Sequence, residues 1–430
     1  MERLREVIGR HIPRLPIVAT MGLVALLAAC GQGASLASSS GGAHVTLTLE
    51  YLAQGRDEMA PFVKSFEKAY PNITVHVQYT PVDTYNQALY TQLQAGNAPD
   101  VFYTNGGTGQ NLSVIPLGKA GYLANLADRS WAHKVPSAAH DLYWVGNKLY
   151  GLPMGMSIVG VVYNVSLFHQ LGFQVPQTFS QLVALCPKIK AEGKIPMALA
   201  GQLPDLYGEA PAASTVYASD PSWNQQRQAG KTTFASTKGW QEALDEFTAL
   251  NAAGCFQPGA AAGTIAQAFN LLASNQAVMF LAPSAAIGAI EGINPQFQAA
   301  MFPVPGPSAA STRAVVEYND SFSVNAHSSH LDAAMKLLDF LSQDDQQQRY
   351  AEEQAEVSLP DAAVGKVPAT YSAFGPYLKA NKVVTLPTLI WPNAAVGTAL
   401  TKGLQGLMTG QDTVSTVLRN MDSAWDSGSS

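Results

Sequence analysis

Five short segments near the start of the chain alternate between two hydrophobic periods, and this alternation restricts the fold more than any other feature. Residues 45–51 and 73–79 alternate apolar and polar side chains, as strands in a sheet do. Residues 59–70 and 85–95 carry apolar side chains at helical spacing, and a short apolar strand follows at 101–103. This order of strand, helix, strand, helix and strand predicts a parallel sheet covered by helices, and therefore an α/β fold.

The rest of the chain repeats this mixture less regularly. Further strands are predicted at 158–163 and 277–281, and helices at 179–191, 238–253, 331–350 and 394–425, the last interrupted near Gly410. Without its first 29 residues the chain has about 400, which exceeds what one hydrophobic core usually supports and predicts two lobes.

The N-terminus has the composition of an export signal. Four arginines lie within residues 1–14, and an uncharged apolar run follows at 17–29. That run is about a dozen residues long, which is too short to span a bilayer as a helix. It ends in Leu27-Ala28-Ala29-Cys30, which resembles the lipobox of bacterial lipoproteins. The resemblance implies a signal peptide at 1–29 and a lipid on Cys30; a cysteine that ends a signal anchor is the alternative.

Residues 30–43 are mostly Gly, Ser and Ala and are predicted to form a flexible tether. The whole chain has a net charge of −6; without residues 1–29 it keeps 21 basic and 29 acidic residues, a net charge of −8. No basic block remains, so we expect no nucleic-acid partner. Cys186 and Cys255 are either a disulfide pair or two free buried thiols, and their spacing does not decide between the two.

Several short runs occur in an order that resembles one family. They include Tyr70-Pro71-Asn72-Ile73, Ala95-Gly96-Asn97-Ala98-Pro99-Asp100-Val101, Gly121-Tyr122-Leu123, Lys148-Leu149-Tyr150-Gly151-Leu152-Pro153 with Tyr163-Asn164, and Pro176-Gln177-Thr178-Phe179. Together they resemble the extracellular solute-binding proteins of ABC importers, in the sugar-binding group that includes maltose-type proteins. The resemblance covers nearly all of residues 45–426.

This resemblance implies a periplasmic-binding-protein-like fold of type II, with two α/β lobes joined by a hinge. The N-lobe is expected at 44–153 plus 314–357, and the C-lobe at 154–313 plus 358–430. The implied function is to capture a small polar solute, most often a sugar or oligosaccharide, and deliver it to an ABC permease. The implied protein is a monomer, anchored by lipid at the outer face of the bacterial cell membrane, and has no cofactor or metal.

A sugar site needs polar side chains for hydroxyl groups and aromatic or apolar faces for C–H surfaces. By position, the resemblance assigns ligand contacts to Gln54, Arg56, Thr104, Asn105, Ser157, Tyr207, Trp223, Pro283, Ser284, Tyr318, Asn319 and Trp391. Tyr207 and Trp391 are equally compatible with ordinary packing. Thr104 and Ser284 stand where maltose-type relatives carry tryptophan, and this departure leaves the ligand class open.

The sequence favours binding over catalysis. It contains neither a G-x-S-x-G nor an H-E-x-x-H motif, so neither a serine-hydrolase elbow nor a zinc-peptidase site is predicted. A secreted carbohydrate-active enzyme is the alternative from another class, and it needs two carboxyl groups about 5–10 Å apart in the cleft. A solute-binding protein for a polyamine, an amino acid or a peptide is the other alternative.

Overall fold

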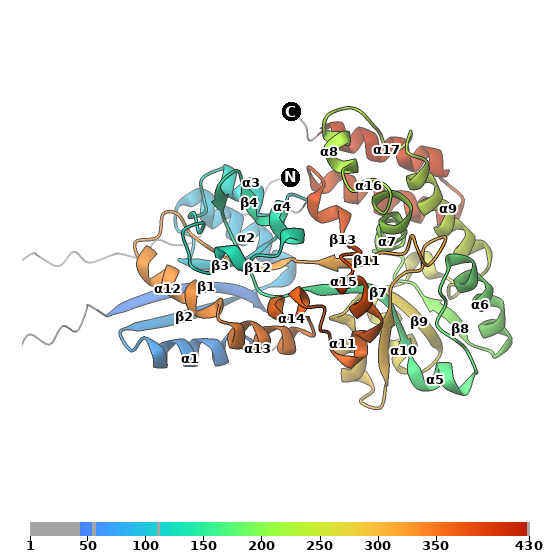
Figure 1. Ribbon diagram of the computed structural model, residues 1–430, viewed down its shortest axis with the longest axis horizontal. Helices are drawn as coiled ribbons and strands as arrows, with labels where there is room; N and C mark the ends of the chain where they lie inside the picture. Colours follow the sequence, from blue (N-terminus) through green and yellow to red (C-terminus); the bar gives the residue numbers. More distant parts are fainter. Residues whose placement is uncertain (1–43, 54–56, 110–111, 428–430) are drawn as a thin grey trace, which may run out of the picture. The chain divides into compact units, whose positions relative to one another are not determined.

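The computed structural model describes residues 44–53, 57–109 and 112–427 (Figure 1). The predicted signal peptide, the tether, Cys30, Gln54 and Arg56 lie outside the described residues. The first half contains β1 (Val45–Ala53), α1 (Ala60–Ala69), β2 (Ile73–Pro81), α2 (Val82–Ala95), β3 (Val101–Asn105), α3 (Val114–Lys119), α4 (His140–Tyr143), β4 (Trp144–Val145), β5 (Lys148–Leu149), β6 (Leu152–Pro153), β7 (Ser157–Asn164), α5 (Val165–Gln170), α6 (Phe179–Ala191), β8 (Ile195–Ala198) and α7 (Leu206–Ala212).

The second half, coloured from green to red in Figure 1, completes the fold. It contains α8 (Trp223–Gln228), α9 (Lys238–Ala252), α10 (Ile265–Ala273), β9 (Ala277–Pro283), α11 (Ala286–Ile293), β10 (Ala299–Phe302), β11 (Ala314–Glu317), β12 (Asp320–Val324), α12 (Leu331–Leu341), α13 (Asp344–Gln354), α14 (Leu359–Ala363), α15 (Gly375–Lys379), β13 (Val383–Thr385), α16 (Ala394–Thr409) and α17 (Val414–Ser427). Short turns of 3₁₀ or π helix lie between them, among them one at Pro387–Ile390.

The first sheet has the strand order β2-β1-β3-β12-β6. β1 runs parallel to both β2 and β3, as the alternation of strands and helices predicts, and β12 is antiparallel to β3 and β6. The helices cover this sheet with aromatic side chains: Phe66 of α1 contacts Phe340 of α12, with ring centroids 5.6 Å apart. From α2, the Tyr85 hydroxyl donates to the Tyr103 carbonyl at 2.8 Å.

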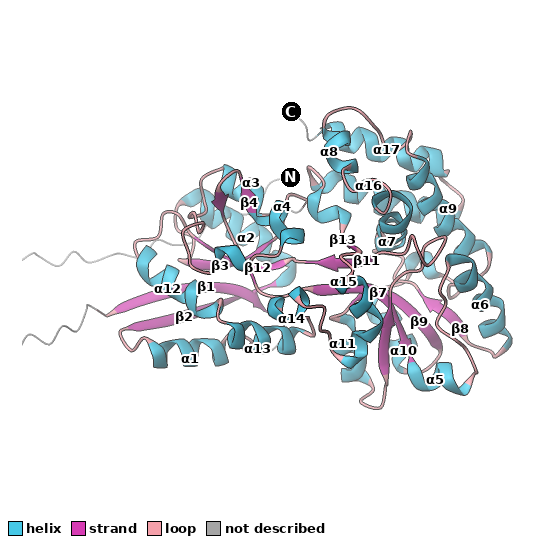
Figure 2. Cartoon of the chain, viewed as in Figure 1, coloured by secondary structure: helices cyan, strands magenta, loops and turns pink. Residues whose placement is uncertain are grey.

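The second sheet has the order β13-β11-β7-β9-β8. β11 pairs with residues 157–159 of β7, and β10 pairs with residues 161–164 along the same edge of that strand. β9 and β11 are both antiparallel to β7, while β8 is parallel to β9 and β13 is parallel to β11. β8, β9, β11 and β13 therefore all point the same way, and their carboxyl ends lie at one edge of the sheet. Figure 2 shows the helices that cover this second sheet.

The chain passes from one sheet to the other through short segments. The first passage is at 154–156, between β6 and β7, and the second is at Tyr318–Asn319, between β11 and β12. Residues 314–317, which the sequence assigns to the N-lobe, pair with the strands of the second sheet. The strand pairing therefore puts the second passage between the sheets at Tyr318–Asn319, and not at residue 314. The other predicted lobe boundaries stay a proposal.

Two further findings concern the predicted elements. The single helix predicted at 331–350 is two helices, α12 and α13, because Gln343 adopts an extended conformation (φ −66°, ψ 143°) and Asp344 and Asp345 begin a new helix. Acidic residues in a first turn interact favourably with the positive end of the helix dipole. The last helical region is interrupted at Gly410, as predicted, where φ is +74°.

Cys186 of α6 and Cys255, which follows α9, form a disulfide bond, with Cα atoms 5.1 Å apart. Both residues are fully buried. The question that their spacing left open is therefore settled in favour of a pair, which ties α6 to the segment after α9. No helix in the described part of the chain is long and apolar enough to cross a membrane.

Candidate ligand-binding cavity

A cavity of about 530 Å³ lies beyond the carboxyl ends of the four strands that share a direction in the second sheet. Each strand leads directly into its wall: β8 into Ala200, β9 into Pro283 and Ala285, β11 into Glu317 and Asn319, and β13 into Leu386. Ligands of open α/β sheets bind in this position, because loops from several parallel strands meet there. The passage between the two sheets, at Tyr318–Asn319, borders the same cavity.

Most of the cavity wall is apolar. Residues that line it include Leu203, Leu206, Tyr207, Ile265, Phe269, Phe280, Leu281 and Leu389. Leu203 and Ile265 are 56% and 40% exposed, so part of this apolar wall is open. An open apolar wall of this kind suits a ligand with flat C–H surfaces, such as a pyranose ring.

The polar part of the wall is acidic. Asp205, Glu317, Asn319 and Thr388 line the cavity, and its described lining contains no Lys, Arg or His. Burial, with the charges of Asp320 and Asp205, raises the pKa of Glu317 to about 7. Burial also raises the pKa of Asp205. These carboxyl groups therefore lie in an environment that disfavours their charged forms.

Glu209 connects this wall to the segment after β13. It is fully buried on α7, and its carboxyl group accepts hydrogen bonds from the Thr388 backbone N–H, at 2.8 Å, and from the Thr388 hydroxyl. Burial and the nearby charges of Asp205 and Glu317 raise its pKa well above the ordinary value. The Thr388 side of the cavity is thus fixed to α7 through one carboxyl group.

Two more acids, both partly buried, interact with these groups. Asp320 accepts hydrogen bonds from the hydroxyls of Tyr103, at 2.7 Å, and Tyr350, at 3.1 Å, yet burial still raises its pKa. Burial, Asp320 and Glu317 raise the pKa of Glu356 well above its usual range. We refer to Asp205, Glu209, Glu317, Asp320 and Glu356 as the acidic row.

The structure brings only part of the predicted site together. Tyr207, Pro283 and Asn319 line the cavity, and Tyr318 lies next to Asn319 but is almost fully buried. Tyr207 is also nearly buried, and its hydroxyl donates to the Ala198 carbonyl at 3.1 Å. Only a small part of its side chain is therefore open to the cavity.

Four predicted polar contacts are engaged within the protein. The hydroxyls of Ser157 and Ser284 lie 3.2 Å apart across β7 and the end of β9. The Thr104 hydroxyl is fully buried between those of Ser321 and Ser323, at 2.9 and 2.8 Å. Asn105 accepts a hydrogen bond from the Tyr103 hydroxyl at 3.1 Å. None of these four residues is among those that line the cavity.

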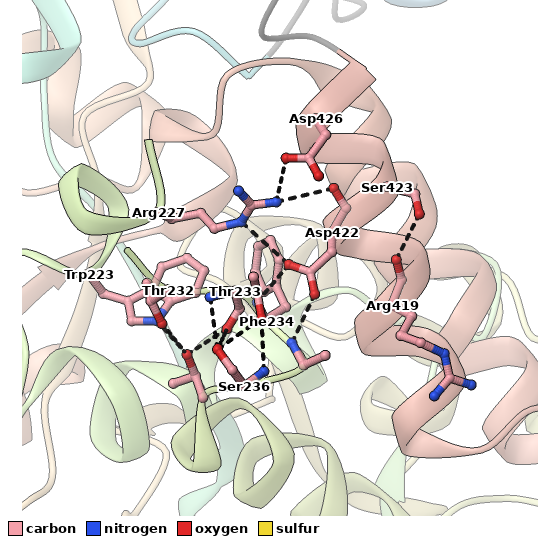
Figure 3. A network of polar contacts seen from close by, with 12 residues as sticks. Trp223, Arg227, Thr232, Thr233, Phe234, Ser236, Arg419, Asp422, Ser423 and Asp426 are labelled. Atoms are coloured by element: carbon pink, nitrogen blue, oxygen red, sulfur yellow. Dashed lines mark hydrogen bonds and ion pairs between the residues drawn. The ribbon is translucent and has the colours of Figure 1, made fainter. Parts of the chain in front are cut away.

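The two predicted tryptophans lie in an aromatic cluster, away from the cavity lining. Trp223 and Trp391 are both buried, and each contacts Phe234 and Trp240. The Trp223 indole N–H donates to the Thr237 hydroxyl at 2.8 Å. Figure 3 shows this region beside Arg227, whose guanidinium contacts Asp426 at 2.6 Å and Asp422 at 3.4 Å and so joins α8 to α17.

A glycine-rich loop after β3 approaches the other side of the segment after β13. The backbone N–H groups of Thr108 and Gly109 donate to the Leu389 carbonyl, at 2.8 and 3.4 Å, and the Thr108 hydroxyl donates to the Trp391 carbonyl. A Cβ atom at Gly107 or Gly109 would overlap the carbonyl oxygen of Leu389 or Thr388. The segment that lines the cavity with Leu386, Thr388 and Leu389 is therefore fixed on both sides.

The sequence interpretation did not identify Asp205, Glu317 and Thr388 as cavity residues. A signal for Glu317 was present: it is a carboxylate directly after the apolar run Ala314–Val316 and directly before Tyr318 and Asn319, which were predicted. Asp205 lies directly before α7 and Thr388 lies in the 3₁₀ turn at Pro387–Ile390, and the approach of both to the cavity depends on strands far away in the sequence. No group of three or more His, Cys, Asp or Glu side chains in the described ranges is placed to hold a metal ion.

Comparisons with known proteins agree with this architecture. Residues 50–348 match the family described as bacterial extracellular solute-binding protein. The multiple sugar-binding protein of Streptococcus mutans is 28% identical over 353 residues, which is 78% of this chain and 80% of that protein. RafE of Streptococcus pneumoniae in its apo form superimposes with a TM-score of 0.73 at 20% identity, over 90% of this chain and 99% of RafE. A structure of RafE in complex with raffinose gives a TM-score of 0.70, also at 20% identity, over 89% and 100% of the two chains.

The chain belongs to the bacterial extracellular solute-binding protein family, because the family match covers more than half of it. The structural likeness confirms the predicted two-lobed α/β fold. Membership of an extracellular family also agrees with the export that the N-terminal sequence predicts.

Proposed function

We propose that this protein binds a sugar or an oligosaccharide in the cavity beyond β8, β9, β11 and β13, and delivers it to the membrane subunits of an ABC importer. One observation supports the location most directly: the carboxyl ends of four strands meet at a cavity of about 530 Å³ with apolar walls and a few polar groups. The sugar class is supported by the relatives, one of which is a multiple sugar-binding protein and another of which was solved with raffinose.

The lining suits the two surfaces of a sugar. Asp205, Glu317 and Asn319 offer acceptors for hydroxyl groups, and the open side chains of Leu203 and Ile265 offer an apolar face. In a two-lobed protein each lobe supplies part of the contacts, so a ligand that touches both favours the closed state. Among the predicted contacts, we propose Tyr207, Pro283 and Asn319 as the ones that touch ligand.

The remaining parts of the proposal come from the sequence and the family. We propose that the protein is a monomer outside the cytoplasm, held at the cell membrane by a lipid on Cys30, without a nucleic-acid partner or a cofactor. We also propose that it binds without catalysis. This part of the proposal is supported by the family, which is one of extracellular solute-binding proteins.

The proposed function is tested by measuring the melting temperature of the purified protein with a panel of monosaccharides and neutral or aminated oligosaccharides. Amino acids, polyamines and short peptides complete the panel. A ligand present at 100 times its Kd adds about 2.7 kcal/mol to the free energy of unfolding, which gives a clear upward shift. Isothermal titration calorimetry then measures the Kd of any sugar that shifts the melt.

The Asn319→Ala variant should weaken binding of that sugar by about tenfold, the usual effect of losing one well-placed hydrogen bond in a cavity. Asn97→Ala is the matched control, since Asn97 is exposed at the end of α2. A shift with an amino acid, polyamine or peptide but with no sugar would show that the carbohydrate assignment is wrong. Hydrolysis of a glycoside by the purified protein would instead support the enzyme alternative.

A further inference from the structure

The acidic row is the least expected feature of a site for neutral sugars. Its five carboxyl groups influence one another: Asp205 and Glu317 raise the pKa of Glu209, and Asp320 and Glu317 raise the pKa of Glu356. Two of them, Asp205 and Glu317, form part of the cavity wall. A positive charge on the ligand would favour the ionised forms of these acids, and no described basic residue of the wall competes for them, so the wall is suited to a cationic ligand.

One hydrogen-bond acceptor of this wall has no partner. The Asn319 side-chain oxygen is buried and finds no hydrogen-bond partner among the described residues. A buried acceptor without a partner is unfavourable, because it has lost its hydrogen bonds to water and gained none in the protein. Asn319 lines the cavity itself, so a ligand that enters the cavity is able to reach this part of the wall.

The chemistry that satisfies these groups is a compact donor with a positive charge. A sugar hydroxyl brings a single donor and no charge, whereas a protonated amine brings up to three donors and one positive charge. The apolar side of the cavity, formed by residues such as Leu203, Ile265 and Phe269, still provides a surface for the ring that carries the amine. A linear polyamine could pair with the acids, but it has no ring whose flat face could pack against the apolar wall.

On the basis of the proposed function, we propose that the carbohydrate taken up carries a protonated amine, and that Glu317 and Asp205 bind this amine with help from the Asn319 side-chain oxygen. The ligand class is therefore an amino sugar or an oligosaccharide that contains one. Glu317 and Asp205 determine specificity, because they favour the aminated sugar over its neutral counterpart.

The ionisation of Glu317 gives an independent readout. The groups whose charges act on Glu317 are Asp320 and Asp205, and Glu209 and Glu356 follow in the same row. All are acids, so none offsets a negative charge on Glu317. An amine that keeps its proton should therefore bind more tightly as the pH rises from about 5 to about 6.5 and Glu317 begins to lose its proton. A neutral sugar should show no such rise.

The test compares glucosamine oligosaccharides with the matching N-acetylglucosamine oligosaccharides, in which acetylation removes the positive charge on nitrogen. Calorimetric titrations use the wild-type protein, Glu317→Gln, Asp205→Asn and the control Glu291→Gln. Glu291 is an exposed acid on α11, the helix that also contributes Ala286 and Ala289 to the cavity wall. The melting temperature of each variant shows that it is folded before binding is measured.

At about pH 6.5, where the amine is still protonated, the wild type and Glu291→Gln should bind the aminated oligosaccharide about tenfold or more tightly than its acetylated counterpart. Glu317→Gln and Asp205→Asn should lose most of this preference. Equal affinity for the two sugars, or an unchanged preference in both acid variants, would overturn the inference and leave the proposed function intact. Binding of spermidine, or of nothing in the panel, with no sugar bound would overturn the proposed function itself.

Discussion

Glu317 shows how one side chain can link the pH to the stability of this fold. It ends β11 beside the cavity, where burial and the charges of Asp320 and Asp205 raise its pKa to about 7. In the unfolded chain a glutamate has a pKa of about 4.3. The folded protein therefore binds the proton more tightly. The favourable contribution is complete below about pH 4.3 and is lost as the pH rises through about 7.

We predict that Glu317→Gln makes the protein more stable than the wild type at pH 8, by about 2 kcal/mol, because the variant never places a charge in this site. At pH 4 the two proteins should be nearly equal, since the wild-type carboxyl is then protonated. Urea unfolding at several pH values measures the difference. Glu291→Gln is the control, and a difference between Glu317→Gln and the wild type that does not change between pH 4 and pH 8 would contradict the prediction.

Individual site residues were harder to predict than their neighbourhood. Asn319 and Pro283 line the cavity, near the ends of β11 and β9, and their contact with a ligand stays a prediction. The resemblance assigned Trp223 and Trp391 as ligand contacts by position, with ordinary packing as the alternative for Trp391, and in the structure both are buried in an aromatic cluster. A sequence does not reveal which neighbours surround an aromatic ring, since those neighbours come from distant helices such as α9 and α17.

At the scale of elements, the glycine-rich loop after β3 and the segment after β13 depend on each other. The loop backbone lies so close to Thr388 and Leu389 that neither Gly107 nor Gly109 has room for a side chain. Thr388 in turn lines the cavity and contacts Glu209. A change in the loop should therefore be felt at the cavity, although the loop itself is not part of its lining.

We predict that Gly109→Ala lowers the free energy of unfolding by about 2 kcal/mol or more, because a methyl group would overlap the Thr388 carbonyl oxygen and force the two segments apart. It should also weaken ligand binding. Gly292→Ala is the matched control: Gly292 lies in α11 with open space around it, so alanine there should be neutral or slightly stabilising. Equal stability of the two variants would show that the loop and Thr388 do not need this close contact.

Regular elements were predicted well where hydrophobic periodicity is strong. The strands at the start of the chain, the helix at 179–191 and the break near Gly410 all appear as expected. The helix predicted at 331–350 was wrong in its continuity, because α12 ends at Leu341 and the backbone is extended at Gln343 before α13 begins. The apolar pattern belongs to α12, whereas α13 is mainly polar and buries Gln346 and Gln347 beside Tyr350, so hydrophobic periodicity does not locate the break between the two helices.

For the whole molecule, the family resemblance gave the two-lobed architecture, which the comparisons confirm, but not the point where the chain crosses between the sheets. β11 is short, and its apolar residues suit a strand in either sheet. Its pairing with β7 and β13 depends on contacts that no local pattern contains. The cavity is likewise a product of this topology, since its wall combines segments that lie far apart in the sequence.

We predict that Cys30→Ser releases the protein from the membrane, because the serine hydroxyl cannot take the place of the lipidated thiol. Ser39→Ala, a change in the predicted tether, is the control and should leave the protein in the membrane fraction. Fractionation of cells that express each variant, followed by detection of the protein in each fraction, measures the effect. A Cys30→Ser protein that still sediments with the membrane would contradict the lipid anchor.

The position of β12 has a consequence for how the protein is made. This strand lies inside the first sheet, between β3 and β6, and its Asp320 contacts Tyr103, which is 217 residues earlier in the sequence. While the chain is being exported, the edges of β3 and β6 that pair with β12 stay unpaired until most of the strands of the second sheet have emerged. Exposed strand edges promote aggregation. A shortened chain that ends before β12 should therefore be insoluble. A prematurely terminated product would then aggregate instead of folding into a partly functional protein.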